Sequence, residues 1–148
     1  RDVAYHFLSI AAADVEGEGL THLKLQNLLF YAQGFHLAIF GRRLFPDAIE
    51  AWEHGPVVPS AWHAFKNFVS APIPAPATVD ESGLSQEQRD LLNDIWNTYG
   101  QFSAWKLRNM THEEPPWTGT YQPGRNVPIT DGAMSRYFRT QVADGEAA

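Results

Sequence analysis

The spacing of apolar residues along the chain predicts helices. Near the N-terminus apolar positions recur at the three- and four-residue intervals of a helix, at Val3, Phe7, Leu8, Ala11 and Val15. Residues 22–40 are apolar over a wide arc, which is typical of a central, mostly buried helix. Thr21 is placed to cap the start of this helix, and Gly41 to end it in the left-handed conformation. We therefore expect one long helix to organise the core.

The later helices are predicted from capping signals that precede apolar stripes. Ser85 and Gln88 have the spacing of a capping box, in which each side chain hydrogen-bonds the other residue's backbone N–H. Proline is tolerated in the first turn of a helix because its missing N–H would have no helical partner there. The expected starts of the later helices are Pro59, Ser85, Ser103 and Thr130. Together these signals predict about six helices around the central one.

The connections between these helices are irregular. Pro46 and Asp47 form a turn signal between residues 44–45 and 49–52, which predicts a short two-stranded hairpin. Residues 70–84 hold three prolines that alternate with small residues, so we expect an extended, exposed loop. Residues 111–129 are expected to form a long ordered loop, and residues 143–148 a frayed tail. The prediction is a mainly α fold, one compact domain over residues 1–148.

Composition and charge narrow the classes of function. A chain of 148 residues, 44% of them apolar, has the size of one domain with its own core. The absence of cysteine excludes disulfides, thiol catalysis and cysteine-based zinc sites. The net charge is −6 and the eleven basic residues are scattered along the sequence, which disfavours nucleic acid and favours a basic partner. No apolar run has the length of a membrane span, so we expect a soluble, cytoplasmic protein.

Motifs for catalysis or metal binding are weak. His112 begins a stretch that resembles a zinc-protease helix, but Pro116 stands where the second histidine is required, and no two histidines are three or four residues apart. An acid–base pair of adjacent residues is a weak signal, because neighbours in sequence point different ways on most backbones. The alternative function is a small hydrolase-like or metal-dependent enzyme. It would use Glu53, His54, His112 and Glu113 or Glu114. We predict no catalytic residue, metal or cofactor.

Two stretches combine tryptophan, histidine, glutamate and proline: EAWEHGPVVPSAW at residues 50–62 and THEEPPW at residues 111–117. Trp62 and Trp117 stand beside prolines and polar residues, which suits a half-exposed rim that anchors a partner. Such tryptophans can equally well cover the edge of a core. The residues expected to stiffen the turns are Gly55, Pro56, Pro59 and Pro116.

Several long stretches occur together in a specific order. They are THLKLQNLLFYAQGFHLAIFGRRLF, IEAWEHGPVVPSAW, WNTYGQFSAWKL, and THEEPPW followed by MSRYF. In wording and order they resemble the Panacea domain, the antitoxin domain of SocA-like and phage-associated GepA-like bacterial proteins. The resemblance runs from about Val3 to Phe138. Asn27, Phe30 and Phe35 depart from the residues more usual in the family, which bears on the identity of the partner.

The resemblance implies a non-enzymatic antitoxin of a type II toxin–antitoxin pair. Such a protein neutralises a protein toxin, usually encoded by the adjacent gene, by direct contact, and SocA-like members also deliver the toxin to the ClpXP protease. We hypothesise that the two tryptophan-containing stretches lie together and rim a groove floored by residues 22–40. The partner-binding residues would then be Lys24, Gln26, Tyr31, Trp52, His54, Trp62, His112, Glu114 and Trp117.

Two other hypotheses remain beside this one. Both stretches could be purely structural, with the toxin bound elsewhere, for example on the N-terminal helix. A DNA-binding regulator is the third reading, because many antitoxins repress their own operons. That function requires a basic stripe on one helix, and the sequence shows none.

Overall fold

The computed structural model describes residues 2–13, 19–68, 71–76 and 82–142. The helices are α1 (Asp2–Ala13), α2 (His22–Phe40), α3 (Pro59–Phe65), α4 (Gln86–Tyr99), α5 (Ala104–Thr111), α6 (Pro115–Thr118) and α7 (Asp131–Val142), with a short 3-10 helix (Lys66–Phe68) after α3. The strands are β1 (Glu50–Trp52), β2 (Gly55–Val57) and β3 (Val127–Pro128). The predicted mainly α fold is confirmed. Val15 and the expected tail, residues 143–148, lie outside the described residues.

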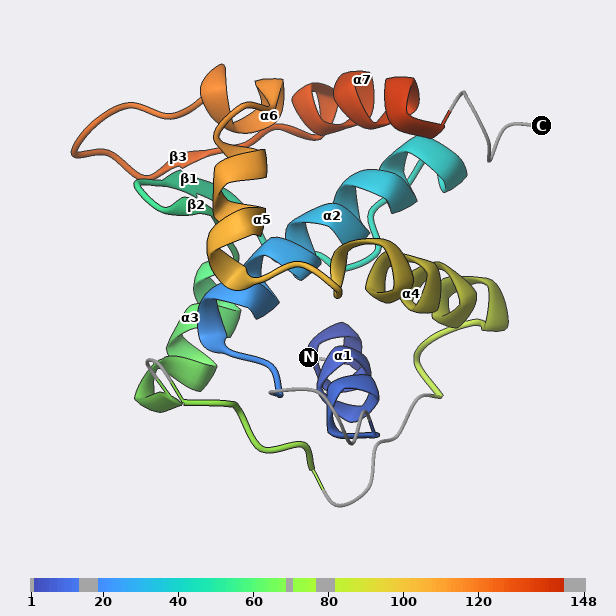
Figure 1. The fold of residues 1–148 in the computed structure, drawn as a ribbon. Helices are drawn as coiled ribbons and strands as arrows, with labels where there is room; N and C mark the ends of the chain where they lie inside the picture. The colour runs from blue at the N-terminus through green and yellow to red at the C-terminus, as the bar shows by residue number, and fades with distance from the viewer. Residues whose placement is uncertain (1, 14–18, 69–70, 77–81, 143–148) are drawn as a thin grey trace.

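Helix α2 is the central element, as predicted. Figure 1 shows it running through the middle of the molecule, and α1, α3, α4, α5 and α7 all pack against it. Helix α7 approaches α2 closely at Gly34, where a Cβ atom would fall 2.1 Å from the ring of Phe138. Gly41 ends α2 in the left-handed conformation, with φ of 73°. Thr21 holds the N-cap position, but its side chain makes no capping hydrogen bond, so that part of the prediction is wrong.

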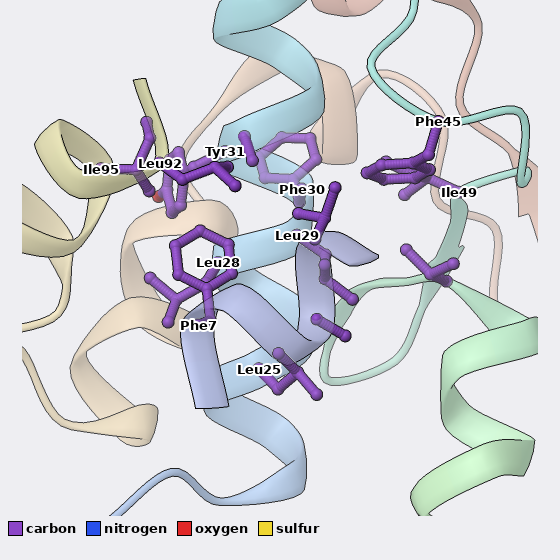
Figure 2. Packing of buried hydrophobic residues seen from close by; sticks show 14 of the residues in the cluster. Phe7, Leu25, Leu28, Leu29, Phe30, Tyr31, Phe45, Ile49, Leu92 and Ile95 are labelled. Carbon is purple, nitrogen blue, oxygen red and sulfur yellow. The ribbon is translucent and has the colours of Figure 1, made fainter. Parts of the chain in front are cut away.

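The hydrophobic core surrounds α2 on several sides. Leu25, Leu28 and Phe30 of α2 are fully buried. Figure 2 shows side chains from α1, from α4 and from the segment after α2 gathered on this helix. They include Phe7, Leu92, Ile95, Phe45 and Ile49. Apolar area removed from water in this way is the main favourable term for such a fold.

The predicted helix starts are confirmed. Ser85 and Gln88 form the complete capping box of α4. The Ser103 hydroxyl accepts a hydrogen bond from the Lys106 backbone N–H at the start of α5. Pro59 occupies the first turn of α3. The Thr130 hydroxyl accepts from the Ala133 N–H at 3.0 Å in the first turn of α7.

The predicted hairpin is wrong in its register and its turn. Strand β1 pairs antiparallel with β2 across a turn at residues 53–54, and β3 pairs on the other side of β1. Residues 44–45 are unavailable for pairing because Gln33 of α2 holds their backbone. Its amide donates to the Phe45 carbonyl at 2.7 Å and accepts from the Leu44 N–H at 2.6 Å. Because the buried Gln33 side chain occupies these backbone groups, the hairpin forms later in the chain than predicted, within the tryptophan-containing stretch.

Two predicted loops contain more structure than expected. Residues 111–129 include α6 and β3, because Pro115 and Pro116 occupy the first positions of a helix, where no N–H partner is needed. In the proline-rich segment Ile73 is buried, and its N–H donates to the Leu20 carbonyl at 2.8 Å. Leu84, at the end of the predicted loop, is buried too, so the prediction of an exposed loop is wrong at both residues. Residues 70 and 77–81 lie outside the described residues.

Candidate functional site

The two tryptophan-containing stretches meet directly, as predicted. We call this contact the hairpin junction: the β1–β2 turn (residues 52–55) against the connection from α5 to α6 (residues 111–117). Nε2 of His112 lies 2.8 Å from the Glu53 carbonyl oxygen. The indole N–H of Trp117 donates to the Trp52 carbonyl at 2.7 Å. The imidazole of His112 packs against the Trp117 indole at a tilt of 38°, with 3.9 Å between ring centroids.

Helix α2 supports the hairpin junction from beneath. The Val58 N–H, just after β2, donates to the Gln26 side-chain oxygen at 2.9 Å. Gly55 has φ of 122°, and a Cβ atom there would lie 3.2 Å from the Thr111 hydroxyl and 3.4 Å from the Asn27 amide oxygen. Only glycine combines that backbone angle with so close an approach. Pro56 is tolerated because β2 is an edge strand.

The two tryptophans proposed as rim residues differ in exposure. Trp62 is half-buried, 5.4 Å from the Trp52 ring and 4.2 Å from the His22 ring, measured between centroids. Trp117 is only 9% exposed, so the prediction that it is half-exposed is wrong. The prolines that start α6 turn its indole inward, between the Trp52 carbonyl, His112 and the stacked ring of Tyr121.

Glu114 lies inside the protein, on the α2 side of the hairpin junction. Its two carboxylate oxygens are 3.1 and 2.9 Å from the Tyr31 hydroxyl, which donates to them, and Tyr137 of α7 also hydrogen-bonds this carboxylate. Burial raises the pKa of Glu114 to about 7, against the lowering effect of these two hydrogen bonds. Burial and the nearby carboxylate also raise the pKa of Tyr31 and Tyr137 above the ordinary value of a phenol.

The nine predicted partner-binding residues therefore divide by exposure. Gln26, Tyr31, Glu114 and Trp117 are buried, Lys24, Trp52, Trp62 and His112 are partly exposed, and His54 is exposed. The Lys24 ammonium donates to the Gly100 carbonyl at 2.6 Å and lies 5.3 Å from the Trp96 ring centroid. Helix α2 contacts both stretches, through the hydrogen bond of Gln26 to Val58 and that of Tyr31 to Glu114.

An exposed aromatic residue beside the hairpin junction was missed at the level of sequence. Trp105 of α5 is 61% exposed, and the Arg108 guanidinium lies 4.5 Å from its ring centroid. Nε of Arg108 also donates to Nδ1 of His54 at 3.4 Å. We call Glu53, His54, Trp105 and Arg108 the rim patch. The signal was available: the buried residues of α5, Leu107 and Thr111, are four apart, and Trp105 is off that stripe.

Among the residues of the enzyme alternative that the structure describes, only Glu53 and His54 bring their side chains together, with 3.4 Å between the Glu53 carboxylate and Nε2 of His54. Both ring nitrogens of His112 contact backbone carbonyls, those of Arg108 at 2.7 Å and of Glu53 at 2.8 Å, so neither faces a carboxylate. Glu114 faces Tyr31 inside the protein, so it does not join the exposed Glu53–His54 pair on the turn. Within the described ranges no group of three or more histidine, aspartate or glutamate side chains could hold a metal ion. No described helix is long and apolar enough to cross a membrane.

The chain matches a known protein family. Residues 25–118 match the model of the SocA-like antitoxin, Panacea domain. The matched segment is more than half of the 148 residues and contains nearly all of α2, the hairpin junction and α3 to α6. The comparisons with curated proteins and with solved structures give no match.

Proposed function

Because the chain belongs to the SocA-like antitoxin, Panacea domain, family, we propose that it neutralises a cognate protein toxin by direct binding, as the antitoxin of a bacterial type II pair. The family match over residues 25–118 is the observation that carries this proposal. It also supports a non-enzymatic role. The toxin is expected from the adjacent gene, and the net charge of −6 favours a basic toxin surface.

We place the toxin contact on the rim patch, with Trp62 at its border. Tryptophan and arginine are the residues that most often dominate the energy of protein interfaces, and here the exposed Trp105 and Arg108 lie against each other. The turn that carries His54 is held from behind by the His112 and Trp117 hydrogen bonds. A surface fixed in this way loses little conformational entropy on binding. The buried Gln26, Tyr31 and Glu114 then act as supports of the surface.

The test is co-expression of the chain with the product of the adjacent gene, followed by affinity measurement on the purified pair. The product should be toxic alone and harmless with the chain. We expect Trp105→Ala with Arg108→Ala to weaken binding at least about tenfold and to abolish rescue. Ile39→Ala is the matched control, because Ile39 is an exposed apolar residue at the far end of α2. Equal affinity in both variants would move the contact elsewhere, with α1 as the next surface to test.

Delivery of the bound toxin to ClpXP is the second step of the proposal, and the family alone supports it. The measurement is the half-life of the toxin with purified ClpXP, with and without this chain. A shorter half-life that requires the intact rim patch supports the adaptor role. Tight binding with an unchanged half-life would leave neutralisation by sequestration alone.

A further inference from the structure

A concavity that shares no lining residue with the hairpin junction contains half of the protein's arginines. It has a volume of about 480 Å³ and lies between the C-terminal end of α2 and residues 131–139 of α7. We call it the arginine pocket. Its lining includes Arg42, Arg43, Arg136 and Arg139, four of the eight arginines in the chain. Residues that are scattered along the sequence are therefore brought to one place by the fold.

One of the four arginines, Arg43, is already bound to other groups of the protein and stabilises the fold. The Arg43 guanidinium pairs with the Asp131 carboxylate at the start of α7. It also donates to the backbone carbonyls of Asp47, at 2.6 Å, and of Phe45, at 3.1 Å. These contacts hold the segment after α2 against the first turn of α7. They fix one wall of the arginine pocket and neutralise Asp131, the one acidic residue in its lining.

The other three arginines are available to a ligand. Within the part of the chain that the structure describes, the side chains of Arg136 and Arg139 form no hydrogen bond or ion pair. The Arg42 guanidinium lies 5.8 Å from the Phe40 ring centroid, and only the backbone carbonyl of Arg42 contacts His36, at 2.7 Å. Four arginines and one aspartate give the lining a charge of +4 − 1 = +3. Like charges held together repel one another, and an anion in the pocket relieves that repulsion.

The first turn of α7 adds to this positive field. Gly132, which has no side chain to cover the backbone, lines the arginine pocket beside Asp131 and Ser135. The N-terminal end of a helix carries a partial positive charge that favours anions. The concavity is also in the size range of small-molecule sites, about 300–1,000 Å³.

We propose that the arginine pocket binds the polyphosphate group of a small ligand, with pyrophosphate as its simplest form. Guanidinium groups present paired N–H donors that match phosphate oxygens bidentately. Two linked phosphates carry about three negative charges near neutral pH, which equals the charge of the lining, whereas a single carboxylate would leave two positive charges uncompensated.

Duplex nucleic acid is a poorer fit. With +3 assigned to the arginine pocket, the rest of a chain of net charge −6 carries −6 − 3 = −9. A duplex laid across the pocket would meet that acidic surface, whereas a compact ligand within the concavity would not. The pocket also joins Arg42 and Arg43, inside the family-matched segment, to Arg136 and Arg139 beyond it. The inference therefore stands independently of the antitoxin proposal.

The experiment is isothermal titration of the full chain with sodium pyrophosphate at about 50 mM salt, repeated at about 200 mM. We expect one saturable site that weakens as salt rises. Arg136→Gln with Arg139→Gln should lower the affinity at least about tenfold. The matched control is Arg125→Gln, because Arg125 is exposed and its side chain hydrogen-bonds only Gln122 nearby, at 3.4 Å. The control should bind pyrophosphate as the parent does.

Three outcomes would overturn the inference. The first is no saturable binding, or the same loss in the Arg125→Gln control. The second is arginine-dependent binding of a short DNA duplex that is tighter than that of pyrophosphate, which would indicate a nucleic-acid surface. The third is equal affinity for a hexaglutamate peptide, which would indicate a site for acidic protein segments. Arg42→Gln, on the opposite wall, provides a second variant if the α7 double variant unfolds.

Discussion

The hairpin junction and the arginine pocket differ in whether their polar side chains have partners within the protein. At the junction His112, Trp117 and Glu114 are each satisfied by a nearby protein group, and two of the three are buried. In the arginine pocket Arg136 and Arg139 face solvent without a partner among the described residues. A buried polar group needs a hydrogen-bond partner within the protein because burial removes its water, whereas an exposed cation keeps its hydrating water. His112, Trp117 and Glu114 therefore stabilise the fold, whereas Arg136 and Arg139 remain available to bind a ligand.

This comparison predicts where substitutions act. A change within the hairpin junction should lower the free energy of unfolding, since it leaves a cavity or an unpaired buried group. A change at Arg136 or Arg139 of the arginine pocket should alter ligand affinity and leave folding nearly intact.

Trp117→Ala should cause the largest loss, about 3–5 kcal/mol in the free energy of unfolding. The substitution removes a buried indole, its hydrogen bond to the Trp52 carbonyl, its stacking on Tyr121 and its contact with the tilted ring of His112. Urea denaturation followed by circular dichroism measures it. Trp62→Ala is the control, since Trp62 is half-buried and should cost clearly less. If the two variants lose equal stability, the structural role assigned to Trp117 is wrong.

Glu114→Gln should change the dependence of stability on pH. The carboxyl has a pKa of about 7 in the folded protein against an ordinary 4.5. Below pH 4.5 it is protonated in both states. Between about 4.5 and 7 only the unfolded chain releases the proton, so the free energy of unfolding falls as pH rises, by about 3 kcal/mol. Above pH 7 this contribution is constant.

The glutamine variant lacks that titration and still offers an oxygen to Tyr31. Its stability relative to the parent should therefore rise between pH 4.5 and 7, as measured by urea denaturation at several pH values. Burial lowers the pKa of His22 and His36, which reduces stability as pH falls below about 6.5 in both proteins and cancels in the difference. A difference that does not vary with pH would contradict the raised pKa of Glu114.

Gly55→Ala should cost about 2 kcal/mol, because φ of 122° strains a residue with a side chain and the new Cβ would press on Thr111 and Asn27. Gly124→Ala is a matched control. Gly124 also has a positive φ, of 77°, but nothing lies within 4 Å of the Cβ position. The control should lose only about 1 kcal/mol in thermal or urea denaturation. Equal losses would show that backbone strain, not the approach of α2, makes glycine necessary at residue 55.

Local signals in the sequence predicted the helices well. The capping box at Ser85, the proline at residue 59 and the broad apolar arc of residues 22–40 each depend on neighbours within a few positions. The long motifs also indicated the family. The prediction that the two tryptophan-containing stretches lie together is confirmed by the hydrogen bonds between them. Information of this kind is contained in short windows, so reading the chain segment by segment recovers it.

The features that sequence could not supply depend on contacts between distant residues. Gln33 hydrogen-bonds the backbone of Leu44 and Phe45, and the hairpin therefore forms later in the chain than the sequence predicted. The burial of Trp117 depends on a carbonyl 65 positions earlier in the chain. The arginine pocket joins residues 42–43 to residues 136–139, and no window along the sequence contains both pairs. Contacts of this range are set by how α2 and α7 pack, which propensities do not encode.

Arg136→Gln with Arg139→Gln should have the smallest effect on folding, within about 0.5 kcal/mol of the parent in the absence of ligand. Neither side chain is paired with a described residue, and their removal relieves repulsion between like charges. The double variant should be slightly more stable than the parent at low salt, and this gain should vanish at high salt, where such repulsion is screened. Urea denaturation at both salt concentrations measures the effect. A loss above about 1 kcal/mol would mean that these cations are part of the fold, and the contrast with the hairpin junction would fail.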